Sequence, residues 1–230
     1  MDKQTKKELI DIVEKNYKQI AGHYSETRKK ILWPKLKKLI DLIPDNSNIL
    51  DVGCGSGKIL SEFNNKNIKY LGIDSSVEML EQAKKQYPNQ NFTQGNILNL
   101  GKISGLNYDY IFCIAVIHHL PGFDLRVQAL RQLKNKIKPN GKIIISVWNL
   151  WSQEKYKKLI YKFFLLKLIK KNKLDFGDIL FDWKNNKREI VSKRYYHAFT
   201  KRELKKISKK AGFKNIKIHK DNFNYYLILF

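Results

Sequence analysis

ILDVGCGSG, residues 49–57, is a short apolar run that leads into three glycines at alternate positions. The run predicts a buried strand, and the residues after Gly57 predict a helix. Gly53, Gly55 and Gly57 have no Cβ atom, so the backbone can turn tightly there and approach a ligand closely. The N–H groups at the start of the helix would then face that ligand. The stretch therefore predicts a ligand-binding turn between a strand and a helix.

A carboxylate follows the next predicted strand. That strand covers residues 69–73, and Asp74 comes directly after it. An acidic side chain at this place can accept hydrogen bonds from both hydroxyls of a ribose. The glycine spacing is shorter than the Gly-x-Gly-x-x-Gly pattern of dinucleotide-binding proteins, so a pyrophosphate is not expected. A nicotinamide-binding fold and a tight turn without a ligand are the alternatives.

Short apolar segments alternate with helical segments through the middle of the chain. We predict further strands at residues 92–94, 108–115 and 142–148, and helices at 58–64, 77–86 and 124–136. A turn at Pro139-Asn140-Gly141 precedes the last of these strands. The alternation predicts a doubly wound, mostly parallel α/β sheet with helices on both faces. Such sheets bind ligands beyond the carboxyl ends of their strands, where the glycines and Asp74 lie.

The two ends of the chain add further elements. Helices are predicted at 6–20 and after Pro34, and a helix at 201–211 precedes strands at 215–219 and 224–230. We expect the last two strands to form an antiparallel hairpin that completes the sheet. The segment YKKLIYKFFLLKLIKK, residues 156–171, predicts a basic helix with a broad apolar face. We expect it to act as a lid or to pack on the core, with a membrane-surface helix as the alternative.

The composition indicates a globular protein with an anionic partner. Hydrophobic residues make up 43% of the chain, and no run of apolar residues is long enough for a membrane span or a signal peptide, so we expect a cytoplasmic protein. The net charge is +24, which favours nucleic acid as partner, although lysine-rich codon usage is an alternative explanation. Cys54 and Cys113 have no zinc-like spacing, so we expect buried, reduced thiols and no metal.

The glycines, the strand contexts and Asp74 together resemble the class I S-adenosylmethionine (SAM)-dependent methyltransferases, over residues 45–150. The resemblance implies SAM as cofactor and a Rossmann-like sheet of seven strands. It also implies that Asp51 and the glycines lie near the methionine part of SAM, that Asp74 holds the ribose and that Asn96 contacts the adenine. That family more often has Asp where this chain has Asn96. The implied cofactor-binding set is completed by Ser75, Ile97 and Ile114.

Four further segments resemble one subfamily, the tRNA methyltransferases that esterify 5-carboxymethyluridine at the wobble position. These segments are residues 20–28 with Trp33-Pro34, residues 114–120 with Arg126, residues 147–148, and residues 178–183 with 193–199 and Glu203-Leu204. The resemblance implies the tRNA anticodon loop as partner. It also implies a small zinc-binding activator protein at the sheet edge near the third strand, around Phe92.

The chemistry of that reaction suggests candidate catalytic residues. A carboxylate has a pKa near 4 and is already a nucleophile at neutral pH, so it needs positioning rather than a base. Cations can grip it, and we take Arg28, His118 and Arg194 as the candidates that converge beside the methyl group. Tyr195 and Tyr196 could stack on a flipped base.

Each candidate has a structural alternative. Arg28 could pair with Glu26 or with the cofactor carboxylate, His118 could hydrogen-bond to backbone, and Arg194 could form a surface salt bridge. At least one of the two tyrosines is expected in the core, and His119 is expected to be structural.

The chain is interpreted as one methyltransferase domain in four parts. These are N-terminal helices (1–44), a SAM-binding core (45–150), an insertion or lid (151–200) and a C-terminal helix with strands (201–230). Lysines within 155–173, 184–193 and 201–210 could neutralise tRNA phosphates. The first hypothesis is therefore methyl ester formation on tRNA. The alternatives are a small-molecule methyltransferase and a non-catalytic RNA-binding protein on the same fold.

Overall fold

The order of the elements follows the predicted alternation of strands and helices. The computed structural model describes residues 1–27, 33–103, 105, 107–184 and 189–230. Its elements, with η for 3₁₀ helices, are α1 (Lys3–Thr27), α2 (Pro34–Asp41), β1 (Ser47–Val52), η1 (Lys58–Phe63), β2 (Ile68–Asp74), α3 (Val77–Gln86), β3 (Asn91–Gln94), η2 (Ile97–Lys102), β4 (Tyr108–Ile114), η3 (Ile117–His119), α4 (Phe123–Lys134), β5 (Ile137–Trp148), η4 (Leu150–Ser152), α5 (Glu154–Leu168), β6 (Asp178–Lys184), β7 (Ile190–His197), α6 (Lys201–Lys210), β8 (Ile216–Lys220) and β9 (Asn224–Leu229).

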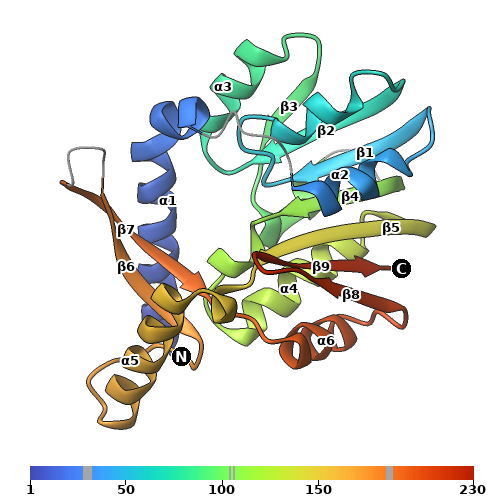
Figure 1. Ribbon diagram of the computed structural model, residues 1–230. Helices are drawn as coiled ribbons and strands as arrows, with labels where there is room; N and C mark the ends of the chain where they lie inside the picture. Colours follow the sequence, from blue (N-terminus) through green and yellow to red (C-terminus); the bar gives the residue numbers. More distant parts are fainter. Residues whose placement is uncertain (28–32, 104, 106, 185–188) are drawn as a thin grey trace.

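Seven strands form one sheet in the order β3-β2-β1-β4-β5-β9-β8 (Figure 1). Strands β1 to β5 pair in parallel, and β9 runs antiparallel to both β5 and β8. The predicted doubly wound sheet with a C-terminal antiparallel hairpin is confirmed. The strand order reverses between β1 and β4, and this reversal is the place where such sheets bind ligands.

The sheet is buried on both faces because successive strand residues point to opposite sides. On one side, Leu50 and Cys113 pack into a core with residues of α4 and α6, such as Leu130. On the other, Ile49 and Phe112 pack with residues of α2 and η1. The near-continuous apolar strands recognised in the sequence therefore fill two cores, one on each face.

The insertion differs from the sequence-based expectation. Besides the predicted basic helix, α5, it contains a separate two-stranded antiparallel sheet of β6 and β7, which the sequence analysis did not predict. Both faces of this hairpin carry apolar residues: Ile179 and Phe181 belong to one core, and Leu180 and Tyr195 to another. A strand that is apolar on both faces shows no alternation, and the pattern is therefore easily missed.

The strand β5 also begins earlier than predicted. It starts at Ile137, so the predicted turn at 139–141 falls inside it. The pairing with β4 steps from Tyr108–Ile137 to Tyr110–Lys142, which leaves the turn residues as a bulge.

Helix α1 stands across the open end of the sheet and packs against both α3 and β7 (Figure 1). Leu9 of this helix is buried with Tyr195 of β7 and Leu174. The N-terminal helix thus joins the insertion to the seven-stranded sheet and its helices. A membrane crossing would need a long apolar helix, and the part of the chain that the structure describes contains none.

Candidate functional site

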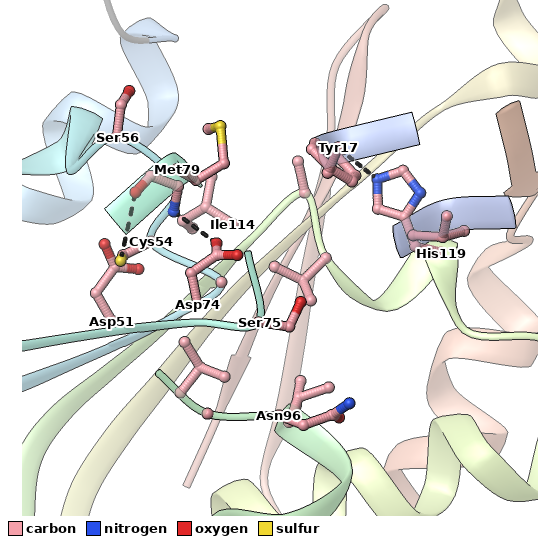
Figure 2. A pocket seen from close by; sticks show the side chains of 18 of the residues that line it. Tyr17, Asp51, Cys54, Ser56, Asp74, Ser75, Met79, Asn96, Ile114 and His119 are labelled. Atoms are coloured by element: carbon pink, nitrogen blue, oxygen red, sulfur yellow. Dashed lines mark hydrogen bonds between the residues drawn. The ribbon is translucent and has the colours of Figure 1, made fainter. Parts of the chain in front are cut away.

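A cavity lies at the carboxyl ends of β1, β2 and β4, where the strand order reverses. Its wall includes eight of the nine residues that the sequence analysis assigned to the cofactor: Asp51, Gly53, Gly55, Asp74, Ser75, Asn96, Ile97 and Ile114. The ninth, Gly57, lies beside the wall at the start of η1. Figure 2 shows Asp51 and Asp74 on one side of this cavity and Tyr17 with His119 on the other.

The glycine turn has the left-handed backbone that its composition predicts. Gly53, Gly55 and Gly57 have φ angles of 75°, 56° and 77°. A Cβ atom on Gly53 would lie 2.3 Å from a methyl carbon of Val116. The backbone N–H of Gly53 donates to the carbonyl of Ile73 at 2.7 Å. The turn is therefore fastened to β2 and leaves no room for a side chain.

Asp74 ties the turn to β2 through its carboxylate. Its Oδ2 accepts the N–H of Gly55 at 2.8 Å, and its Oδ1 accepts the N–H of Ser76 at 2.9 Å. Burial raises the pKa of Asp74 despite these two hydrogen bonds. Each oxygen keeps a further lone pair, so the carboxylate can still accept hydrogen bonds from a ribose.

Asp51 lies deeper, at the end of β1, and is only 2% exposed. Its Oδ2 accepts a hydrogen bond from the hydroxyl of Tyr70 at 2.9 Å. Burial, reinforced by the nearby charge of Asp74, raises the pKa of Asp51 to about 7 although the Tyr70 bond lowers it. A bound cation would favour the ionised form of this carboxylate.

Asn96 comes directly before η2 and lines the cavity. Its side-chain oxygen accepts the N–H of Leu98 at 2.9 Å, so it caps the short helix. The oxygen and the amide group both retain hydrogen-bonding capacity for a ligand. Ile97 and Ile114 contribute apolar side chains to the wall of the same cavity.

His119, rather than His118, lines the cavity. Its Nε2 is 2.8 Å from the hydroxyl of Tyr17, and its Nδ1 is 3.3 Å from the carbonyl oxygen of Tyr195. Burial lowers the pKa of His119 to about 3. His119 is therefore a neutral ring that connects α1, η3 and β7.

His118 lies behind that wall and is 1% exposed. Its ring centroid is 5.6 Å from that of Trp148 and 5.1 Å from that of Tyr196. Its Nδ1 has no hydrogen-bond partner among the described residues. Burial lowers the pKa of His118 well below its ordinary value, so the ring is neutral. His118 was expected to supply a positive charge, but its buried ring is neutral.

Arg194 of β7 is 4% exposed, which is inconsistent with a surface salt bridge. Its guanidinium lies over the ring of Trp183, 3.4 Å from the centroid, and its Nη1 donates to the hydroxyl of Tyr196 at 3.3 Å. Nε and Nη2 are buried and find no acceptor in the described part of the chain. Buried donors without an acceptor are costly, and the two N–H groups on this edge of the guanidinium are able to donate to an anion.

The two tyrosines of β7 point to opposite sides of the strand. Tyr195 is fully buried, and its hydroxyl donates to Asp178 at 2.8 Å, which gives this side chain a structural role. Tyr196 instead contacts the rings of His118, His119 and Trp148.

Arg28, the remaining catalytic candidate predicted from the sequence, lies outside the described residues.

Tyr17 and His119 line the cavity, and neither was predicted to do so. Tyr17 falls within the helix predicted at 6–20, and His119 was expected to be structural. Their separation in the chain leaves no local pattern that would link them. Only the packing of α1 across the sheet brings the phenol and the imidazole together.

The arrangement of strands and cavity defines the fold of the class I SAM-dependent methyltransferases. The chain is similar to the DhpI–SAM–HEP complex, with a TM-score of 0.69 and 16% identity, covering 96% of this chain and 97% of that one. It is also similar to a SAM-dependent methyltransferase of Methanosarcina mazei, with a TM-score of 0.66 and 19% identity, covering 87% and 98%.

A family model described as a methyltransferase domain matches residues 24–218, and the chain therefore belongs to the methyltransferase domain family. SAM is accordingly the cofactor of this cavity, and the residues present fit it. The left-handed glycines present backbone without side chains at the cavity, while Asp51 and Asp74 offer two carboxylates.

Three curated relatives share one name, tRNA (carboxymethyluridine(34)-5-O)-methyltransferase. The Schizosaccharomyces pombe protein is 27% identical over 235 residues, which cover 95% of each chain. The Saccharomyces cerevisiae protein is 34% identical over 140 residues, covering 61% of this chain and 49% of the relative. A Mus musculus protein is 30% identical over 162 residues, covering 69% and 24%. The chain thus spans about half the length of the Saccharomyces cerevisiae relative and about a quarter of the mouse relative.

Proposed function

We propose that the protein transfers the methyl group of SAM to the carboxylate of 5-carboxymethyluridine at the wobble position of tRNA and forms a methyl ester. The observation that carries this proposal is the buried edge of Arg194, whose two donors have no acceptor among the described residues and whose charge acts on His119 of the cavity wall. The names of the relatives support tRNA as the class of substrate.

The free edge of Arg194 has the shape that a carboxylate requires. Nε and Nη2 lie on the same side of the planar guanidinium, so their two N–H groups match the two oxygens of one carboxylate. Nη1, on the other side, is already bonded to Tyr196. Arg194 can therefore hold the acceptor without losing its present contact.

The neutral histidines agree with an acceptor that is already ionised. A carboxylate with a pKa near 4 carries no proton to remove at neutral pH. When bound, SAM supplies an electrophilic methyl group on a sulfonium, and the protein has to align the carboxylate with it. We assign His118 to donate a hydrogen bond from Nδ1 to the acceptor, and Arg28 to be a second cation. Tyr196, rather than Tyr195, is assigned to contact the base.

The positive charge of the chain suits an RNA partner in the cytoplasm. Lysine and arginine total 45 residues against 21 acidic ones, and contacts of such residues with phosphates would add affinity without reading sequence. We therefore propose the anticodon loop as the bound region. We further propose that a small zinc-binding activator pairs with β3, the four-residue strand at one edge of the sheet.

The test is methyl transfer to tRNA from a host that lacks the protein. Purified protein with methyl-labelled SAM should label this tRNA, mild alkali should release the label, and nucleoside mass spectrometry should find the methyl ester of 5-carboxymethyluridine. The zinc-binding candidate is added in a parallel reaction. Absence of ester in both reactions, with SAM bound, would refute the proposal; label on a small acid instead would indicate a metabolite methyltransferase.

A further inference from the structure

Four charged side chains meet in the interior below β7, outside the SAM cavity. They are Arg126 of α4, Asp178 of β6, His197 of β7 and Glu203 of α6, and we call them the buried charge cluster. Arg126, Asp178 and His197 are each at most 2% exposed. Charged contacts thus join α4 in the core to the three successive elements β6, β7 and α6.

The contacts in the cluster centre on one oxygen of Asp178. Its Oδ1 accepts from Nη2 of Arg126 at 3.2 Å and from the hydroxyl of Tyr195 at 2.8 Å. The same oxygen lies 2.7 Å from Nδ1 of His197. On the other side of the ring, Nε2 of His197 is 2.9 Å from both carboxylate oxygens of Glu203. Arg126 also donates to Glu203 from Nη1 at 3.1 Å.

The hydrogen bonds of His197 depend on the charge of its two partners. Carboxyl groups have an ordinary pKa near 4, and Arg126 donates to Asp178 at 3.2 Å and to Glu203 at 3.1 Å. Both carboxylates are therefore ionised and can only accept hydrogen bonds. A neutral imidazole has one N–H group and could satisfy only one of them. Both ring nitrogens must donate, so two cations and two anions balance.

The cluster lies on one face of β7, and Arg194 and Tyr196 lie on the other face. Asp178 is paired opposite His197, and Phe181 is paired opposite Arg194. Directly opposed residues share a face, and the faces alternate along the strand. Slippage by one residue would exchange the faces and turn Arg194 to the side that the cluster now occupies.

We propose that His197, doubly protonated between Asp178 and Glu203, is a positioning residue that fixes the register of β7 and thereby presents Arg194 and Tyr196 to the acceptor. The groups that face this ring are Arg126 from α4, Asp178 from β6, Tyr195 from β7, Glu203 from α6 and, more distantly, His118 from η3. The effect on catalysis rests on the proposed function, whereas the protonation of His197 does not.

The protonation is tested by nitrogen-15 NMR of the five histidine rings in the full chain at neutral pH. The ring of His197 should carry protons on both nitrogens, and its signal should be absent in His197→Asn. If this variant does not fold, Glu203→Gln assigns the signal, because it should change only the ring that faces Glu203. A His197 ring with a single proton at neutral pH overturns the proposal.

The positioning role is tested by comparing binding of the two substrates. Glu203→Gln should raise the KM for tRNA roughly tenfold and leave the Kd for SAM unchanged. The matched control is Asp109→Asn, which removes a carboxylate paired with Lys138 at 2.7 Å at the start of β4. Equal losses for SAM and tRNA, or no loss for either, contradict positioning. If the native protein methylates no tRNA, the proposed function fails, and the NMR result still decides the state of His197.

Discussion

The two sides of the site are built in different ways. The cofactor side consists of the glycine turn, Asp51 and Asp74, which come from two successive strands. The proposed acceptor side consists of His118 of η3, Trp148 of β5 and Arg194 of β7, all of which contact Tyr196. A site made by neighbouring turns is visible as a local pattern, whereas a site assembled from distant elements depends on how the insertion packs. The predictions below separate the two sides.

The largest effect is expected for Gly53→Ala on the cofactor side. The new Cβ would lie 2.3 Å from Val116, at a φ of +75° that a side chain rarely adopts. Strain and overpacking should lower the free energy of unfolding by about 2–5 kcal/mol and abolish measurable SAM binding. Calorimetric binding and thermal unfolding measure both effects. Gly101→Ala is the control, since its Cβ would meet nothing within 4 Å; equal effects of the two substitutions would contradict the packing argument.

The next effect concerns the acceptor side alone. Arg194→Met should lower kcat/KM for tRNA by about 10²–10³-fold, because truncating a buried ionic contact costs about 2–5 kcal/mol. The Kd for SAM should stay the same. The melting temperature should be unchanged or higher, since two buried donors that have no acceptor among the described residues disappear. Arg131→Met, on the exposed side of α4, is the control. A fall in melting temperature with intact transfer would assign Arg194 a structural role.

A smaller effect is the pH dependence of SAM affinity. With a pKa of about 7, Asp51 is mostly protonated at pH 6 and mostly ionised at pH 8. Affinity for the positively charged cofactor should rise roughly tenfold over this interval. The raised pKa works oppositely on folding: its stabilising contribution is present at low pH and is lost as the pH rises through about 7. Calorimetric titration from pH 6 to 8 measures the affinity, and Asp51→Asn should flatten the profile.

The smallest effect is expected where the two sides touch. Tyr17→Phe removes the hydroxyl that binds Nε2 of His119, which in turn contacts the carbonyl of Tyr195. The loss of about 1 kcal/mol should raise the Kd for SAM roughly fivefold and raise the KM for tRNA as well. Steady-state kinetics with both substrates measures this coupling, and Tyr161→Phe on the exposed face of α5 is the control. A change in only one substrate would show that His119 does not join the two sides.

The fold and the cofactor side followed from the sequence because each signal is local. An apolar strand followed by alternate glycines defines a turn, and Asp74 ends the next strand. The β6–β7 hairpin did not follow, because its strands are apolar on both faces and show no period of two. Nor did the role of His119, because its contact with Tyr17 joins residues that are 102 positions apart. Burial, which made His118 and His119 neutral, is a property of packing that composition does not reveal.

The buried edge of Arg194 also bears on the choice between similar modified uridines. Its two N–H groups lose their hydration when the chain folds, so an incoming anion has to shed only its own hydration shell. A carbamoylmethyl group has the same outline but presents an amide NH₂ to one of these donors. Such a mismatch leaves buried polar groups opposed, and sites of this kind reject the analogue strongly. Under the proposed function, selectivity for the acid over its amide would originate in the guanidinium edge, and competition by carbamoylmethyluridine-containing anticodon stems would measure it.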